Sequence, residues 1–218
     1  MRSLDIDILR SRYLAAQLNG ERREALRLIV EEGLDHGIDP AVLRRDIVAA
    51  AQLEIGRLWQ ENRISVADEH MATAISQVVL AYLYQRSKAA KARGHSIVVA
   101  CVEGELHDLP ARLVADALDL EGYDVRFLGA NVPTNHLLRA LSDKPVDLVV
   151  LSVTISFNVP SARAAVTQLR AAHPDLKIAV GGGAARFAPD LCRQLGSDLV
   201  ASDADTLIAA VNGLWSSK

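Results

Sequence analysis

Three short segments of the sequence carry side chains that could do chemistry, and each follows a run of apolar residues. Glu105 and His107 come shortly after the run at residues 96–102. Ser152-Val153-Thr154 and Gly181-Gly182-Gly183 end two later runs. An imidazole beside a carboxylate can act as a base or a metal ligand. Small hydroxyl residues and glycines can line a narrow slot without filling it.

Each segment on its own also has an ordinary structural explanation. Glu105 could accept a hydrogen bond from one ring N–H of His107 and so strengthen the histidine as a ligand, but the pair could equally be a polar loop. The hydroxyl residues at 152 and 154 could simply cap a loop. The three glycines lack both the G-x-G-x-x-G spacing and the Walker lysine, so alone they predict a strand-to-helix turn. Only the three segments taken together can distinguish a ligand site from these ordinary structural roles.

The second half of the chain predicts a parallel sheet that would bring the three segments together. The expected strands are residues 96–102, 124–128, 146–153, 177–180 and 197–201, with helices between them that include residues 109–120 and 205–214. Strands that are apolar without alternation are buried on both faces. We therefore predict an α/β fold over residues 94–218, a doubly wound, flavodoxin-like five-stranded sheet, whose ligands bind beyond the carboxyl ends of the strands.

The first half, residues 1–93, predicts an N-terminal four-helix bundle. Helical periodicity covers residues 7–18, 21–35, 40–59 and 66–92. Asp39-Pro40 supplies an N-cap and a first-turn proline, and Ser65 with Asp68 forms a capping box. Short connections between the helices favour an antiparallel arrangement.

Composition narrows the classes of partner. The 218 residues include 24 basic and 27 acidic side chains, a formal net charge of −3, so the chain lacks the basic excess of a nucleic-acid-binding surface. Its apolar stretches are too short to span a bilayer, and its first residues do not resemble an export signal. Cys101 and Cys192 are expected to be buried, reduced thiols. We expect a cytoplasmic protein that binds neither membranes nor nucleic acid directly.

The order and separation of the three segments resemble the cobalamin-binding domain family, which carries Asp-x-His-x-x-Gly, then Ser-x-Leu or Ser-x-Thr, then Gly-Gly. The resemblance implies that His107 replaces the cofactor's own dimethylbenzimidazole as the lower cobalt ligand. It also implies that the displaced nucleotide tail lies beside the hydroxyl and glycine segments. The implied cobalamin-binding residues in this half are Glu105, Leu106, His107, Asp108, Leu109, Ser152, Val153, Thr154, Asn158, Gly181, Gly182 and Gly183.

Two departures from the family motif stand in the first segment. Glu105 replaces the aspartate and keeps a carboxylate acceptor with one more methylene, while Pro110 replaces the glycine and removes a backbone donor. We expect histidine ligation to survive these changes better than tail binding does. We also expect a bulky residue at Gly182 to block the tail and leave the fold intact.

The helical half adds a second pattern: Trp59, nine intervening residues, and then Glu69-His70. It resembles the CarH-type photoreceptors, which bind adenosylcobalamin, and implies that Trp59, Val66, Glu69 and His70 surround the group above the cobalt. Some of these light sensors place a histidine directly after the tryptophan. Gln60 stands there in this chain, so His70 becomes the second candidate cobalt ligand.

The CarH-type regulators usually add a helix-turn-helix domain that this sequence lacks, so the chain more closely resembles an AerR-type regulator that acts through a transcription-factor partner. We predict a non-enzymatic, light-responsive cobalamin sensor. Adenosylcobalamin is favoured over hydroxo- or methylcobalamin as its cofactor, and a second copy of the chain, forming a homo-oligomer, is a further candidate partner. The alternative is a corrinoid protein that carries a methyl group for a methyltransferase system, since those proteins resemble this chain in length and architecture. A mutase subunit is disfavoured because nothing predicts a substrate barrel.

Overall fold

The computed structural model describes residues 5–215, except for the side chains of Leu191 and Cys192. Its internal contacts divide the chain into two units, one ending at Lys88 and the other beginning at Ala89. None of the described helices is both long and apolar enough to cross a membrane. Cys101 is a buried free thiol as predicted, whereas the prediction for Cys192 lies outside the described side chains.

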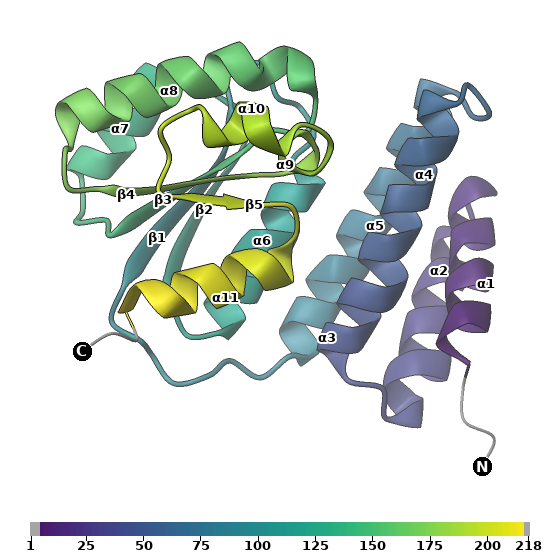
Figure 1. Ribbon diagram of the computed structural model, residues 1–218. Coiled ribbons are helices and arrows are strands. Elements are labelled where there is room, and N and C mark those ends of the chain that lie inside the picture. Colours follow the sequence, from purple (N-terminus) through teal and green to yellow (C-terminus); the bar gives the residue numbers. More distant parts are fainter. Residues whose placement is uncertain (1–4, 216–218) are drawn as a thin grey trace. The chain divides into compact units, whose positions relative to one another are not determined.

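The second unit is built on a five-stranded parallel sheet, which confirms the predicted fold class. Its strands are β1 (Ser96–Val102), β2 (Asp124–Val132), β3 (Leu148–Ser152), β4 (Lys177–Gly181) and β5 (Leu199–Ala201), in the order β2-β1-β3-β4-β5 (Figure 1). The chain leaves β1 toward β2 and then returns to the opposite side of β1 as β3. The strand order therefore reverses between β1 and β3, where such sheets bind their ligands.

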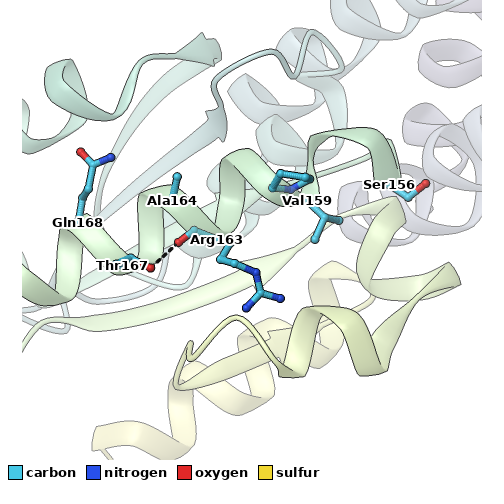
Figure 2. Close-up of a pocket in the computed structure, with 7 residues that line it drawn as sticks. Ser156, Val159, Arg163, Ala164, Thr167 and Gln168 are labelled. Carbon is cyan, nitrogen blue, oxygen red and sulfur yellow. Dashed lines mark hydrogen bonds between the residues drawn. The ribbon is translucent and has the colours of Figure 1, made fainter.

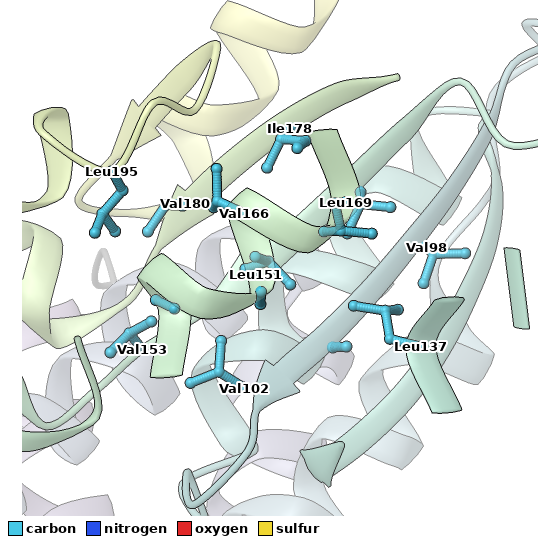
Figure 3. Close-up of a cluster of buried hydrophobic side chains, with 14 of the residues drawn as sticks. Val98, Val102, Leu137, Leu151, Val153, Val166, Leu169, Ile178, Val180 and Leu195 are labelled. Atoms are coloured by element: carbon cyan, nitrogen blue, oxygen red, sulfur yellow. The ribbon is translucent and has the colours of Figure 1, made fainter. Parts of the chain in front are cut away.

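Helices cover both faces of this sheet. They are α6 (Leu109–Leu120), α7 (Thr134–Ser142), α8 (Val159–Ala172), α9 (Gly183–Phe187), α10 (Pro189–Arg193) and α11 (Ala204–Trp215), with a 3₁₀ turn at Ser156–Asn158 before α8. Alternate strand residues pack toward opposite faces. Val98, Leu151 and Val180 lie in the core against α7 and α8 (Figure 3), and Val99 and Val150 lie in the core against α6 and α11.

The first unit is helical, as predicted. It contains α1 (Ile6–Leu18), α2 (Arg22–Arg27), α3 (Pro40–Val42), α4 (Ala50–Gln60) and α5 (Val66–Arg86), with Leu34–His36 in a 3₁₀ turn. The predicted caps are present, since Asp39 accepts from the Ala41 N–H and Ser65 forms the capping box with Asp68. Two segments that we predicted as plain α-helix are instead π-helical, at Leu28–Gly33 and Leu43–Ala49. Gly33 packs there against Leu43, where a Cβ would meet the leucine side chain at 2.9 Å.

The predicted end of the last bundle helix, near Ala92, is wrong. The helix ends at Arg86 and Ser87 is extended. Beyond it, the N–H groups of Ala90 and Arg93 donate to the carbonyls of Leu120 and Gly122 at the end of α6. These tertiary hydrogen bonds override the helical propensity of the Lys/Ala/Arg run, which offers no apolar face to bury.

Candidate functional site

Glu105 and His107 lie in the turn that follows β1, and the structure brings their side chains into contact. The His107 ring donates from Nδ1 to Oε1 of Glu105 at 2.6 Å, and the His107 backbone N–H donates to the same oxygen at 3.0 Å. The Glu105 side chain is fully buried, whereas 32% of the His107 side chain is exposed. A neutral imidazole that donates from Nδ1 carries its lone pair on Nε2, which is the tautomer that a metal ligand needs.

The segment after β3 holds the other oxygen of the Glu105 carboxylate. Oε2 accepts from the backbone N–H groups of Thr154 at 2.8 Å and Ile155 at 3.0 Å, and from Nδ2 of Asn158 at 3.0 Å. The carboxylate thus ties the turn after β1 to the segment after β3, across the point where the strand order reverses. Asn158, one of the cobalamin-binding residues that the resemblance implies, thus hydrogen-bonds to the carboxylate of Glu105.

These hydrogen bonds set the charge state of Glu105. Burial alone would raise the pKa of the carboxyl group, because the charged form loses its hydration. Donation from His107, the Ile155 N–H and Asn158 outweighs burial and lowers the pKa to about 2. Glu105 therefore stays a carboxylate through the physiological range and holds the Nδ1 proton of His107 in place.

We expect the free energy of unfolding to depend on pH through this group. Because the folded pKa lies below the ordinary value of 4.5, the contribution is present above pH 4.5 and disappears as the pH falls toward 2. Glu105→Gln should cost on the order of 3 kcal/mol at neutral pH, and the difference from wild type should shrink over that acid range. Urea unfolding at several pH values measures it, with the exposed neighbour Glu103→Gln as control. A difference that does not vary with pH would contradict the assignment.

Two hydroxyl groups at the end of β3, Oγ of Ser152 and Oγ1 of Thr154, lie buried with no nitrogen or oxygen partner in the described structure, although Ser152 is close to the Cys101 thiol. A buried hydroxyl without a partner is costly, so these groups are suited to a polar ligand that would satisfy them. The residue between them, Val153, is fully buried in the core beneath α8, and its side chain serves packing.

The glycines after β4 are more crowded than we expected. A Cβ on Gly182 would lie 2.5 Å from the carbonyl oxygen of Val153, and one on Gly183 would lie 2.7 Å from that of Thr154. Gly182 also has a φ of +100°. The space that we expected a nucleotide tail to use at Gly182 is therefore filled by the backbone after β3, and a bulky residue there cannot leave the fold intact.

Gly182→Ala should accordingly destabilise the α/β unit. We expect a loss on the order of 3 kcal/mol in the free energy of unfolding, from the left-handed φ and the clash with Val153 together. Gly196→Ala provides the matched control, because Gly196 has a φ of +80° and, among the described residues other than its chain neighbours, no atom lies within 4 Å of its Cβ position. It should lose only about 1 kcal/mol. Equal losses for the two variants in urea unfolding would show that the contact with Val153 is unimportant.

Large apolar side chains are exposed at the same edge of the sheet. Leu106, Phe157 and Phe187 follow the carboxyl ends of β1, β3 and β4 and are 70%, 87% and 72% exposed. We predicted Leu106 as a contact but missed both phenylalanines, which lie shortly after the hydroxyl and glycine segments in the sequence. Their exposure suits a large ligand with an apolar face. Of the neighbouring predicted residues, Leu109 is buried at the start of α6 and Asp108 is its N-cap residue.

An open, mainly apolar groove runs along the outer side of α8. Figure 2 shows Val159, Ala164 and Thr167 along it, with Arg163 extending from the helix. Arg163 donates to the backbone carbonyl of Gln194. None of the predicted cobalamin-binding residues lines this groove, so it is separate from the site around His107.

In the helical unit, a chain of hydrogen bonds fixes the predicted pair at the start of α5. Nε2 of Gln52 donates to Oγ1 of Thr73 at 2.9 Å, and Thr73 donates to Oε1 of Glu69 at 2.8 Å. Oε2 of Glu69 receives the Nδ1 proton of His70 at 2.6 Å, the same arrangement as in Glu105 and His107. The His70 side chain is 72% exposed. Gln52 and Thr73 were not predicted, and their hydrogen bonds connect them to the predicted pair through Glu69.

The other two predicted residues of the helical unit frame the short connection between α4 and α5. Trp59 lies in the last turn of α4, with 36% of its surface exposed, and Val66 opens α5 and is exposed. The N–H of Asn62 donates to the Trp59 carbonyl, and Asn62 has a φ of +54°. The connection thus turns tightly enough to place Trp59 and the first turn of α5 at the same end of the helical unit.

Comparison with known proteins finds the same two-part organisation. A family model described as B12 binding domain matches residues 95–212, and a second with that description matches residues 9–84. The HTH-type transcriptional repressor CarH of Myxococcus xanthus is 33% identical over 152 residues, which are 69% of this chain and 50% of CarH. This chain therefore spans about half the length of that repressor.

Corrinoid proteins match over more of their length. Trimethylamine corrinoid protein 1 of Methanosarcina acetivorans is 24% identical over 193 residues, which are 85% of this chain and 88% of that protein. Among solved structures, the monomethylamine corrinoid protein of Methanosarcina barkeri superposes with a TM-score of 0.79, covering 93% of this chain and 96% of that one. Its sequence identity is 18%, so this likeness concerns the fold.

Proposed function

The chain belongs to the B12-binding domain family, and from this premise we propose that it is a light-responsive cobalamin sensor that acts through a protein partner in transcriptional control. Binding of a cobalamin or related corrinoid follows from the family. The favoured form, adenosylcobalamin, and the sensory role are the proposal. The pattern of Trp59 with Glu69-His70, together with the identity to CarH, is the observation that carries it.

The residues around His107 fit a corrinoid. When bound, cobalamin would supply a cobalt ion that can take a histidine nitrogen as a ligand, and a cobalt–carbon bond that light can break. His107 is the residue that would hold the cobalt, since Glu105 keeps its Nδ1 protonated and its lone pair on Nε2. The buried hydroxyls of Ser152 and Thr154 would satisfy polar groups of the nucleotide tail. Leu106 and the exposed phenylalanines offer apolar surface to the ring system.

The helical unit would supply the contacts that distinguish one upper group from another. An adenosyl group has a base that can stack on an indole and ribose hydroxyls that can bond to a carboxylate or imidazole. Trp59, Glu69 and His70 offer these groups, and Thr73 with Gln52 keeps Glu69 in one orientation. We propose these contacts, and His70 as a second candidate cobalt ligand, from the sequence pattern and the geometry within the helical unit.

The proposed output runs through another protein. The formal net charge of −3 provides no basic excess that would favour nucleic acid, so we propose that a transcription factor or other regulatory protein reads the state of the sensor. CarH is named as a helix-turn-helix repressor, and this chain matches half of its length. Association between copies of this chain is a second form that the output could take.

The second candidate function is that of a methyl carrier. The trimethylamine corrinoid protein matches this chain over 88% of its own length, against 50% for CarH, and this coverage favours the carrier. In that role the partner would be a methyltransferase. A methyl group has neither a base to stack nor hydroxyls to bind, so the carrier role leaves the Trp59 pattern without a purpose.

One experiment separates the two candidates. The protein is mixed with adenosylcobalamin in darkness and then illuminated, and absorption spectra, sizing chromatography and limited proteolysis are recorded before and after. The spectrum reports only that light has broken the cobalt–carbon bond. A sensor should then also change its assembly or its cleavage pattern, because a ligand shifts a two-state equilibrium only through differential contacts. Identical assembly and cleavage before and after photolysis, with methyl transfer from bound methylcobalamin to an acceptor, would establish the carrier instead.

A further inference from the structure

We infer that Asn131 is a positioning residue for His107, which it affects by holding the turn that presents Glu105. The inference rests on the proposed role of His107 as a cobalt ligand. Asn131 lies near the end of β2, outside the three segments that the sequence predicts as a site. Its side chain and its backbone both bond to the turn after β1.

The contact has two points. Oδ1 of Asn131 accepts from the backbone N–H of Gly104 at 2.8 Å, and the backbone N–H of Asn131 donates to the carbonyl oxygen of Glu105 at 2.8 Å. Asn131 has a φ of +50°, a left-handed conformation that asparagine tolerates better than most residues. The residue is thus held in an uncommon backbone conformation that directs both groups at the same turn.

The register of β2 brings Asn131 to that turn. Val99 pairs with Phe127, but Ala100 pairs with Gly129 and Val102 with Val132, so the register shifts twice. Gly129, with a φ of +82°, allows the first of these bulges. The added residues carry β2 past the position where we predicted its end, at residue 128, and place Asn131 beside Gly104. Bulges that re-aim a side chain in this way are common next to functional sites.

The turn has little freedom on its other side. Gly104 has a φ of +86°, and a Cβ there would meet Oδ1 of Asn158 at 3.1 Å. Asn158 and the segment after β3 hold the carboxylate of Glu105, while Asn131 holds the backbone from the side of β2. The 2.6 Å contact from Glu105 to Nδ1 of His107 depends on both supports. Loss of the Asn131 acceptor should therefore loosen the ring and leave the rest of the sheet intact.

Two substitutions isolate the acceptor. Asn131→Gly removes Oδ1 but adopts the left-handed conformation with ease, so the backbone path survives. Asn131→Asp keeps an oxygen acceptor in place of Oδ1. We expect Asn131→Gly to bind adenosylcobalamin in darkness about tenfold more weakly, at the low end of losses for residues behind a metal ligand, and Asn131→Asp to stay near wild type.

The readout must report on His107 itself. Electron paramagnetic resonance of the bound cob(II)alamin form, with ¹⁵N-labelled histidine in the protein, shows whether the axial nitrogen comes from the protein. Asn131→Gly should lower that fraction and Asn131→Asp should restore it. In the protein without cofactor, amide exchange at Gly104 should speed up in Asn131→Gly alone.

The outcomes are distinct. Wild-type affinity and an unchanged axial nitrogen in Asn131→Gly would overturn the inference, and so would equal losses in both variants with unchanged circular dichroism. A wild-type complex without a histidine nitrogen would instead refute the proposed role of His107, and the Asn131 inference would fall with it. Gly104 exchange would then still show whether the contact exists.

Discussion

His107→Ala is expected to bind adenosylcobalamin more than about 100-fold more weakly than wild type, and any complex that forms should lack a protein nitrogen on the cobalt. Losses of about 10- to 100-fold are typical when a group behind a metal ligand is removed, so removal of the ligand itself should exceed that range. The measurements are a titration followed by absorbance and the ¹⁵N-histidine resonance experiment on the cob(II)alamin form.

Matched variants make this result specific. His136→Ala removes an exposed histidine at the start of α7, in the same unit, and should change neither affinity nor spectrum. Glu105→Ala should fall between the two, within about 10- to 100-fold, because His107 remains but its ring loses the acceptor for Nδ1. An unchanged bound spectrum in His107→Ala would remove the basis for the proposed site.

The parts of this site that the sequence predicts are those set by local pattern. Buried parallel strands have no alternation of apolar and polar residues, so all five strands could be found, and the segments that follow them had to meet at one edge of the sheet. Glu105 and His107 are separated by a single residue, so a turn after β1 was enough to bring them into contact. The two helix caps, at Asp39 and Ser65, likewise depend only on near neighbours.

The parts that could not be predicted depend on contacts far apart in the sequence. Asn131 reaches Gly104 only because the register of β2 shifts twice, and no local pattern fixes the register of a strand against its neighbour. The crowding at Gly182 comes from the backbone of Val153, which is distant in the sequence. The three consecutive glycines alone therefore predicted open space where there is none. The early end of α5 follows from hydrogen bonds between Ala90 and the end of α6, which helix propensity does not contain.

Trp59→Ala should discriminate between forms of the cofactor, and this is the largest effect that we expect in the helical unit. Stacking of a base on an aromatic ring is worth about 1–3 kcal/mol, so loss of the indole should weaken adenosylcobalamin binding about tenfold or more. Methylcobalamin offers no base, and its affinity should be unchanged. The measurement is a pair of titrations in darkness. The decisive quantity is the dissociation constant for methylcobalamin divided by that for adenosylcobalamin, which Trp59→Ala should lower.

The ratio separates a specific contact from general damage to the helices. Leu53→Ala is the matched control, because Leu53 is an exposed apolar residue of the same helix, α4. Its loss should not weaken the binding of either form of the cofactor. Glu69→Gln should also lower the ratio, since the ribose would lose a charged acceptor while Thr73 keeps its partner. If Trp59→Ala weakens the binding of both forms equally, the indole stabilises the fold or contacts the ring system that both forms share. A wild-type protein that prefers methylcobalamin, with a ratio that Trp59→Ala does not move, would favour the methyl carrier, because the proposed sensor depends on contacts that only the adenosyl group can make.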